Sequence, residues 1–167
     1  PGIKFGIGPA IENGFYYDFE LPRTLIPEDL AILEDKMKEI MKAKQTFNYV
    51  EEPADKAIEF LRAKNQPYKV EIVADLIKNE GVKVVSFYEN KDKDGNLKFW
   101  DLCEGPHVEK TNQLGAFKLT KIAGAYWRGD EKRPMLQRIY GVCFLEKDEL
   151  KEYLRLQEEA KKRDHRK

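Results

Sequence analysis

Turn dipeptides separate the short strand-like segments of this chain, and this pattern most restricts the folds open to it. Asn13-Gly14 precedes an aromatic run at residues 15–19, and Asp94-Gly95 joins strand-like segments at 82–88 and 98–103. Asn-Gly and Asp-Gly favour tight hairpin turns, which connect antiparallel strands. Helical patterns lie among these hairpins without strict strand–helix alternation, which argues against a parallel sheet. We therefore predict an α+β fold, with helices packed on an antiparallel sheet.

The clearest helix is expected at residues 27–44. Pro27 suits a first helical turn, Glu28 and Asp29 suit the positive end of the helix dipole, and apolar residues recur at helical spacing. The last helix, from residue 146, is almost entirely charged beyond residue 158, so we expect it to act partly as a linker. The remaining segments are predicted as helices at 53–63 and 68–77 and as strands at 3–7, 46–50, 117–126 and 136–145.

The totals narrow the class of protein. With 30 basic and 30 acidic residues among 167, the net charge is zero, and bulk charge gives no support for nucleic-acid binding. No apolar run has membrane-spanning length, and no signal peptide is recognisable. Two cysteines are too few for a disulfide framework, so a reducing, cytoplasmic location is expected. Both ends look cut from a longer chain, and we expect a fragment.

Local charge is less even than the total. Between residues 117 and 138 there are six basic residues and two acidic ones, interleaved with Tyr126 and Trp127. Such a run can follow a phosphate backbone and stack a base. A solvated strand pair with ordinary surface charge is the competing interpretation. The basic residues of this run are Lys118, Lys121, Arg128, Lys132, Arg133 and Arg138.

The densest group of reactive side chains lies in the segment Asp101-Leu102-Cys103-Glu104-Gly105-Pro106-His107. In a strand, Asp101 and Cys103 share one face, and Gly105-Pro106 then turns His107 into a loop. Cys103 and His107 are zinc-ligand types, but a site needs at least three ligands. The alternatives are activation of a water by His107, a Cys–His nucleophilic pair, or a structural cluster satisfied by backbone hydrogen bonds.

Other candidates are weaker. Cys143 lies in an apolar strand-like run and is predicted to be in the core. Lys69 begins a short helix, and its spacing alone indicates a surface lysine. No glycine belongs to a phosphate-binding loop, so ATP binding is not expected on this chain.

Five longer strings are more specific than these single residues. In chain order they are GPAIENGFYYD (8–18), DLCEGPH (101–107), KIAGAYWRGD (121–130), MLQRIYG (135–141) and KRDHRK (162–167). Together they closely resemble the second N-terminal domain of bacterial-type threonyl-tRNA synthetases, and the likeness covers nearly the whole chain. A related domain occurs in alanyl-tRNA synthetases and in free-standing alanyl-tRNA editing proteins.

The resemblance implies an editing domain that hydrolyses seryl-tRNA(Thr). Serine lacks one methyl of threonine, and one methyl discriminates by only ~1–3 kcal/mol, so a second site must supply accuracy. Position by position, it implies cleft roles for Tyr17, Lys69, Asp101, Cys103 and His107. His107 would handle the attacking water, Lys69 the oxyanion, and Asp101 the serine amino or hydroxyl group. The substrate-binding set implied with them is Tyr17, Lys118, Lys121, Tyr126 and Arg128.

The family's cleft also uses an H-x3-H pair on an upstream helix, which this sequence does not contain. The resemblance thus implies zinc at Cys103 and His107 only together with that pair, and ATP only on a catalytic core outside this sequence. The expected division is an editing domain at 1–145 and a helix at 146–167 leading to that core. Expected partners are the acceptor end of tRNA(Thr) and the rest of the synthetase, with no membrane. Glu104 stands where many members have arginine.

Two alternatives stay open: a tRNA-binding fragment without catalysis, and a free-standing alanyl-tRNA editing relative.

Overall fold

The computed structural model describes residues 2–103 and 110–166. The strands are β1 (Lys4–Phe5), β2 (Ala10–Ile11), β3 (Gly14–Glu20), β4 (Thr46–Pro53), β5 (Val84–Lys91), β6 (Leu97–Leu102), β7 (Ala116–Tyr126) and β8 (Met135–Phe144). The helices are α1 (Pro27–Lys42), α2 (Ala54–Ala63), α3 (Pro67–Glu80) and α4 (Lys147–Asp164), with short 3₁₀ turns η1 (Thr111–Gln113) and η2 (Trp127–Gly129).

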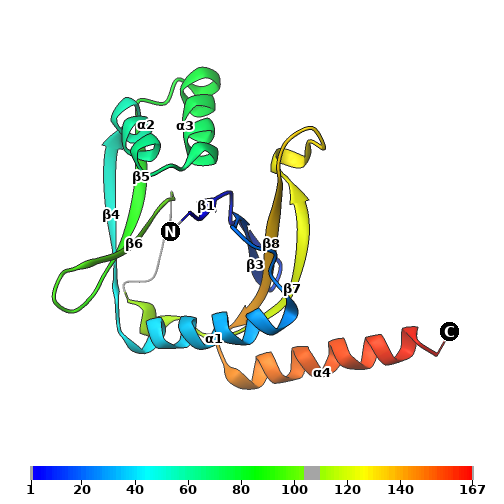
Figure 1. Ribbon diagram of the computed structural model, residues 1–167. Helices are drawn as coiled ribbons and strands as arrows, with labels where there is room; N and C mark the ends of the chain where they lie inside the picture. The colour runs from blue at the N-terminus through cyan, green and yellow to red at the C-terminus, as the bar shows by residue number, and fades with distance from the viewer. Residues whose placement is uncertain (1, 104–109, 167) are drawn as a thin grey trace.

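The strands form two antiparallel sheets, which stand apart in Figure 1. The first has the order β1-β3-β8-β7, with β2 also pairing β3, and the second has the order β4-β5-β6. Helix α1 runs from the first sheet to the second along the lower side of the molecule, while α2 and α3 lie by the second sheet. The α+β class and the antiparallel pairing are confirmed. The sequence did not reveal that the strands divide into two sheets, because hairpin signals specify only neighbouring partners.

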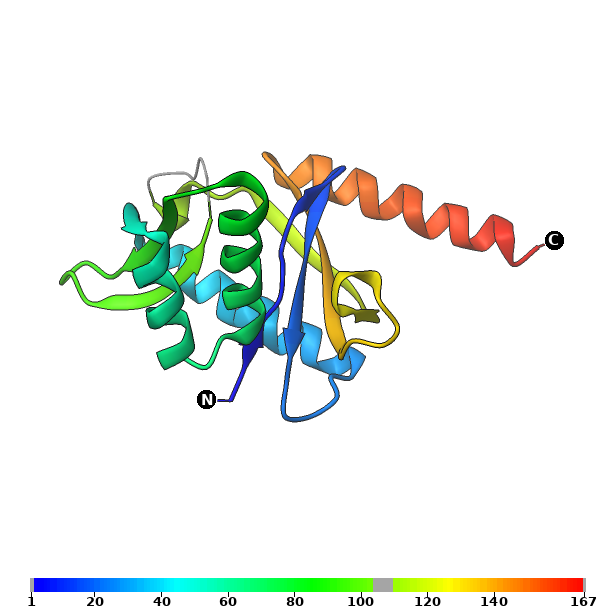
Figure 2. The ribbon, with the colours of Figure 1, turned by 90° about the horizontal axis from the view of Figure 1, so that it is seen from above.

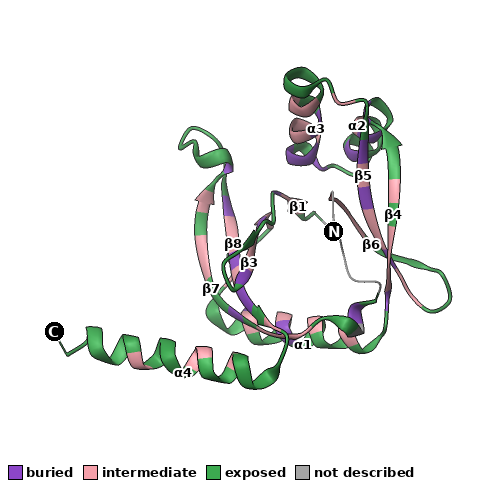
Figure 3. Cartoon of the chain, turned by 180° about the vertical axis from the view of Figure 1, so that it is seen from behind, coloured by how far each residue is buried: buried purple, intermediate pink, exposed green. Residues whose placement is uncertain are grey.

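The main core lies between the second sheet and helices α2 and α3. Leu61 and Val73 are fully buried there against Phe87 of β5. Burying a side chain of this size contributes about 1.5–3 kcal/mol. A second buried cluster joins Tyr68 of α3 to Trp127 of η2 and Leu136 of β8, where the first sheet's strands β7 and β8 are connected. Helix α3 therefore packs against both sheets, and Figure 3 shows its buried inner side.

A glutamine side chain ties β1 to the start of α3. Gln66 is 5% exposed, and its Oε1 accepts the Phe5 N–H at 2.8 Å while its Nε2 donates to the Ile3 carbonyl at 2.9 Å. It thereby satisfies two backbone groups of this very short strand as a neighbouring strand would. Seen from above in Figure 2, β1 runs beside α3. The first turn of α3 is thus fixed relative to the first sheet.

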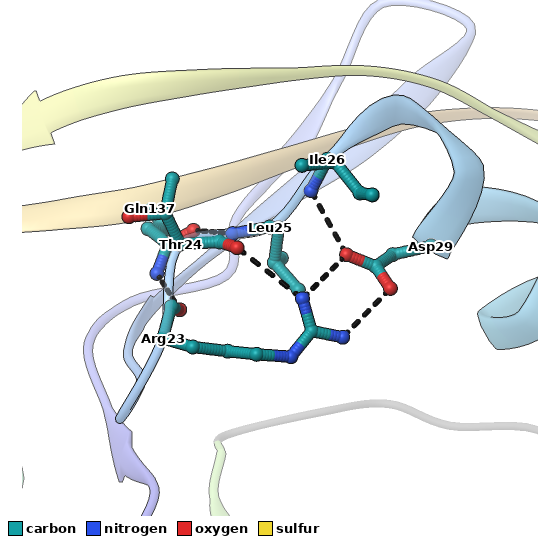
Figure 4. Close-up of polar contacts among 6 residues, drawn as sticks. All are labelled: Arg23, Thr24, Leu25, Ile26, Asp29 and Gln137. Carbon is teal, nitrogen blue, oxygen red and sulfur yellow. Dashed lines mark hydrogen bonds and ion pairs between the residues drawn. The ribbon is translucent and has the colours of Figure 1, made fainter.

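The start of α1 is held by a polar cluster, drawn in Figure 4. Asp29 accepts the Ile26 N–H at 2.8 Å and two hydrogen bonds from the Arg23 guanidinium at 2.7 and 2.9 Å. Gln137 of β8 accepts the Leu25 N–H at 2.6 Å and donates to the Arg23 carbonyl at 2.7 Å. Because Asp29 caps the free backbone donor that precedes the helix, this cluster sets where α1 begins.

The prediction that Cys143 lies in the core is wrong. Cys143 is exposed, whereas its neighbour Val142 is buried. Side chains alternate along β8, so an apolar run does not bury all of its members. Cys143 lies opposite Phe117 of β7, at the rim of an apolar pocket of about 520 Å³ that Met37 and Met41 of α1 also line.

Helix α4 projects from the first sheet, and Tyr153 in its first half packs against Phe144 of β8. The C-terminal helix is confirmed, and the proposed boundary between residues 145 and 146 stays a prediction. Across residues 2–103 and 110–166, no helix is both long and apolar enough to span a bilayer.

Asp29 gives a test of the α1 start. The Arg23 guanidinium, and next the Ile26 N–H, lower the pKa of Asp29 to about 2. A lowered folded-state pKa adds stability above the unfolded value, about 3.9, and this stability is lost as pH falls through about 2. We expect Asp29→Asn to be less stable than the original chain at pH 7, and the difference to shrink between about pH 4 and pH 2.

Urea unfolding at several pH values measures this difference. The matched control is Asp35→Asn, on the exposed side of the same helix. A gap between Asp29→Asn and the original chain that stays constant down to pH 2 contradicts the assignment.

Candidate functional site

Three of the residues expected in the cleft meet where the two sheets and α3 come together. Tyr17 comes from β3, Lys69 from the first turn of α3, and Asp101 from the end of β6. The Lys69 Nζ lies 3.1 Å from Asp101 Oδ1, and the Tyr17 hydroxyl donates to Asp101 Oδ2. The Lys69 Nζ also lies 5.4 Å from the centre of the Tyr17 ring. Residues 84 positions apart in sequence thus form one polar cluster.

Lys69 occupies an unfavourable place for a cation. Its side chain is 5% exposed, and it lies in the first turn of α3, where the helix dipole is positive and no acidic residue balances it. A buried ammonium is tolerated only with a counter-charge, which Asp101 supplies. The interpretation of Lys69 as a surface lysine is wrong, because helical spacing does not show that a second sheet covers that face.

The Tyr17 ring is enclosed by aromatic side chains. It stacks on Phe19 with ring centres 4.8 Å apart and meets the edge of Phe5 at 6.1 Å. Phe5 in turn meets Phe99 of the second sheet at 5.7 Å. Burial, followed by the negative charge of Asp101, raises the pKa of Tyr17 far above its ordinary value. The hydroxyl therefore stays protonated at neutral pH and acts as a donor to Asp101.

Gly8 is a residue of the site that the sequence did not single out. A Cβ at this position would lie 2.0 Å from the Cδ2 of Tyr17, so the backbone of Gly8 lies directly against the ring. The φ of Gly8 is outside the left-handed region, so ring contact rather than backbone conformation requires glycine here.

Cys103 directly follows β6 and continues its pairing with β5. Its N–H donates to the Ser86 carbonyl at 3.1 Å, and the Ser86 hydroxyl donates to the Cys103 carbonyl at 2.7 Å. Cys103 also lines a cleft of about 600 Å³ between α3 and the second sheet.

His107 and Glu104 lie outside the described residues, so the role of His107 stays a prediction. The same holds for a metal at Cys103 and His107. Within residues 2–103 and 110–166, no three side chains of histidine, cysteine, aspartate or glutamate gather as a metal site would need. After that segment, the Thr111 hydroxyl accepts the Gln45 N–H at 3.0 Å and donates to the Ile40 carbonyl at 2.7 Å.

The basic run does not join this cluster. Lys118 pairs with Glu34 at 3.2 Å, and Arg128 pairs with Asp75 and lies 3.7 Å from Glu71. Tyr126 is 40% exposed at the far end of β7. Lys121 is exposed and lies over the Tyr140 ring. Among the described residues, no hydrogen bond or ion pair connects these four to Tyr17, Lys69 or Asp101, so their part in substrate binding stays a prediction.

Comparisons with known proteins show which sequences this chain is similar to. Residues 82–140 match the family model described as the threonyl and alanyl tRNA synthetase second additional domain. All 167 residues align with a threonine–tRNA ligase of Dehalococcoides mccartyi at 54% identity, covering 27% of that protein. The corresponding proteins of Acetivibrio thermocellus and Clostridium botulinum are 50% and 51% identical, with 25% of each covered. The chain spans about a quarter of the length of these curated relatives.

The buried ion pair predicts a large and coupled effect on stability. Asp101→Asn keeps the shape of the side chain but leaves the Lys69 ammonium buried without a counter-charge. We expect the free energy of unfolding to fall by about 3–5 kcal/mol. Adding Lys69→Met should recover much of this loss, because the unpaired charge is then gone. Urea unfolding of the two single variants and the double variant measures the coupling. Asp94→Asn, in the exposed β5–β6 turn, is the control, and additive effects would argue against the pair.

The contact between Gly8 and Tyr17 predicts a second coupling. Gly8→Ala should cost about 1–3 kcal/mol, because the added methyl overlaps the ring and forces it to move. In a Tyr17→Ala background the same change should cost little, since the ring is absent. Unfolding free energies of the four proteins test this. An equal cost of Gly8→Ala in both backgrounds would show that something other than the ring excludes a side chain.

Proposed function

We propose that this chain is the editing domain of a threonyl-tRNA synthetase, because residues 82–140 match the threonyl and alanyl tRNA synthetase second additional domain and all 167 residues align with threonine–tRNA ligases. In this proposal it hydrolyses seryl-tRNA(Thr), with the acceptor end of tRNA(Thr) and the rest of the synthetase as partners. The observation that carries the proposal is the buried Tyr17–Lys69–Asp101 cluster, at the three positions where the sequence resemblance expects cleft residues.

The cluster has the charges that ester hydrolysis needs. Attack of water on the seryl carbonyl produces a tetrahedral intermediate with a negative oxygen. The ammonium of Lys69, held where water is largely excluded, would stabilise that oxygen. Asp101 would bind the positive amino group of serine. Because this amino group would replace Lys69 at the Asp101 carboxylate, the Lys69 ammonium would become free to bind the seryl carbonyl oxygen. Tyr17 would keep Asp101 oriented through its hydroxyl.

The described cluster holds no group free to accept the proton of the water, since Asp101 is engaged by both Lys69 and Tyr17. We assign this task to His107, which follows β6 within a few residues, because the ordinary pKa of a histidine lies near neutral pH. The water oxygen bonds to the carbonyl carbon, the bond to the ribose oxygen breaks, and the proton passes through His107 to that oxygen. Cys103 would shape the pocket beside it.

The test follows release of amino acid from seryl-tRNA(Thr) and from threonyl-tRNA(Thr) in single-turnover reactions, with this chain and with a longer synthetase that contains it. We expect faster release of serine than of threonine. Lys69→Met should lower the serine rate by about 100-fold or more, as loss of an oxyanion donor does. Lys78→Met, exposed on the same helix, should leave it unchanged. Circular dichroism checks that the variants fold.

Equal release of both amino acids, or an undiminished rate in folded Lys69→Met, would contradict the proposal. A second candidate is a tRNA-binding domain without catalysis of its own, which is favoured by the engagement of Asp101 by both Lys69 and Tyr17. It predicts salt-sensitive tRNA binding by this chain with no release of amino acid from either substrate, and release only by the longer synthetase. A preference for mischarged tRNA(Ala) would instead indicate an alanyl-tRNA editing relative.

A further inference from the structure

The structure changes how the basic run at residues 117–138 can be used. Four of its six basic side chains are engaged by carboxylates: Lys118 by Glu34, Arg128 by Glu71 and Asp75, Arg133 by Glu71, and Arg138 by Asp18. Trp127 is 1% exposed and its indole N–H donates to Glu71 at 3.0 Å, so it cannot stack on a ligand. In the described residues, only Lys121 and Lys132 of this run make no ion pair.

Lys121 belongs to a row of side chains across three strands. Tyr16 of β3 pairs with Tyr140 of β8, and Tyr140 pairs with Lys121 of β7. The two rings have centres 5.7 Å apart, and the Lys121 Nζ lies 4.4 Å from the centre of the Tyr140 ring. We call these three residues the Tyr16–Tyr140–Lys121 row.

Two features hold the row in place. Arg138, two residues from Tyr140, places its guanidinium carbon 3.9 Å from the centre of the Tyr16 ring and is fixed by two hydrogen bonds to buried Asp18, at 2.8 and 3.0 Å. The register of β7 shifts between Leu119 and Lys121, so that Lys121 rather than Thr120 lies opposite Tyr140. Bulges of this kind redirect a side chain.

The row is accessible and lies apart from the Lys69 cluster. Lys121 is exposed, and both tyrosines are half-buried. Tyr16 and Tyr17 are adjacent in β3, so their side chains leave opposite faces of the sheet. Because Asp18 balances Arg138, the row carries one unbalanced positive charge, that of Lys121, next to two aromatic faces.

We propose that the Tyr16–Tyr140–Lys121 row is a contact surface for a single strand of RNA, with a base stacked on a tyrosine and a phosphate on Lys121. Aromatic rings on an antiparallel sheet beside a cation are the chemistry that binds unpaired nucleotides without reading their sequence. This inference rests on the proposed function for the identity of the RNA, which is the unpaired acceptor end of a tRNA. The predicted RNA contact is thereby reduced from the whole basic run at residues 117–138 to the Tyr16–Tyr140–Lys121 row.

The test measures binding of fluorescently labelled, uncharged tRNA(Thr) to this chain over a series of salt concentrations. Lys121→Gln should reduce the slope of log binding constant against log salt by about 0.7–1, the loss of one phosphate contact. Lys121→Arg should restore it. Tyr140→Leu should weaken binding about 5-fold or more, as the loss of a stacked base does. Lys132→Gln, in the same run but outside the row, is the control and should change neither quantity.

Near-UV circular dichroism establishes that each variant keeps its packing. Unchanged affinity and slope in Lys121→Gln and Tyr140→Leu would overturn the inference, as would a fall in Lys132→Gln equal to that in Lys121→Gln. Lack of any tRNA binding by the chain would overturn it as well, and would leave a protein partner to be sought for the row. Binding through the row without ester hydrolysis would keep this inference and remove the proposed hydrolysis, so the two can fail separately.

Discussion

The buried ion pair between Lys69 and Asp101 is the constraint around which the rest of the structure is arranged. An ammonium that is 5% exposed at the positive end of a helix is stable only if a carboxylate meets it there. Asp101 belongs to β6 of the second sheet, whereas Lys69 belongs to α3, so the second sheet must be held against α3. The Leu61 and Val73 core fixes that sheet to the helices, and Gln66 fixes the helix to β1. Tyr17 then closes the cluster from the first sheet.

Much of the fold could be predicted because it depends on local patterns. The hairpin at Asp94-Gly95 and the helix beginning at Pro27 are specified by nearby residues, and both are present with boundaries within a few positions of those expected. The division into two sheets depends instead on contacts distant in sequence, such as Phe5 against Phe99. The exposure of Cys143 follows from the alternation of side chains along β8. The apolar residues on either side of it gave no sign that its side chain faces outward.

For the candidate site, residue identity was easier to anticipate than residue surroundings. The resemblance pointed to Tyr17, Lys69 and Asp101, yet composition and spacing alone left Lys69 indistinguishable from a surface lysine. Its environment is created by residues 32 and more positions away. For the basic run at residues 117–138, the sequence led us to expect more free positive charge than the structure contains. The charge of this run was visible in the sequence, but two of the carboxylates that balance it, Glu71 and Asp75, come from α3 and carry no signal linking them to Arg128 and Arg133.

The way Gln66 bridges β1 and α3 has a mechanical consequence. The Gln66 side-chain amide hydrogen-bonds to the backbone of Ile3 and Phe5, and Gln66 precedes Lys69 by three residues. A pull applied to the first residues of the chain would therefore be transmitted through two hydrogen bonds to the opening turn of α3. The buried ammonium lies one helical turn further on. The position of β1 and the position of the Lys69 ammonium are thus coupled through the Gln66 side chain.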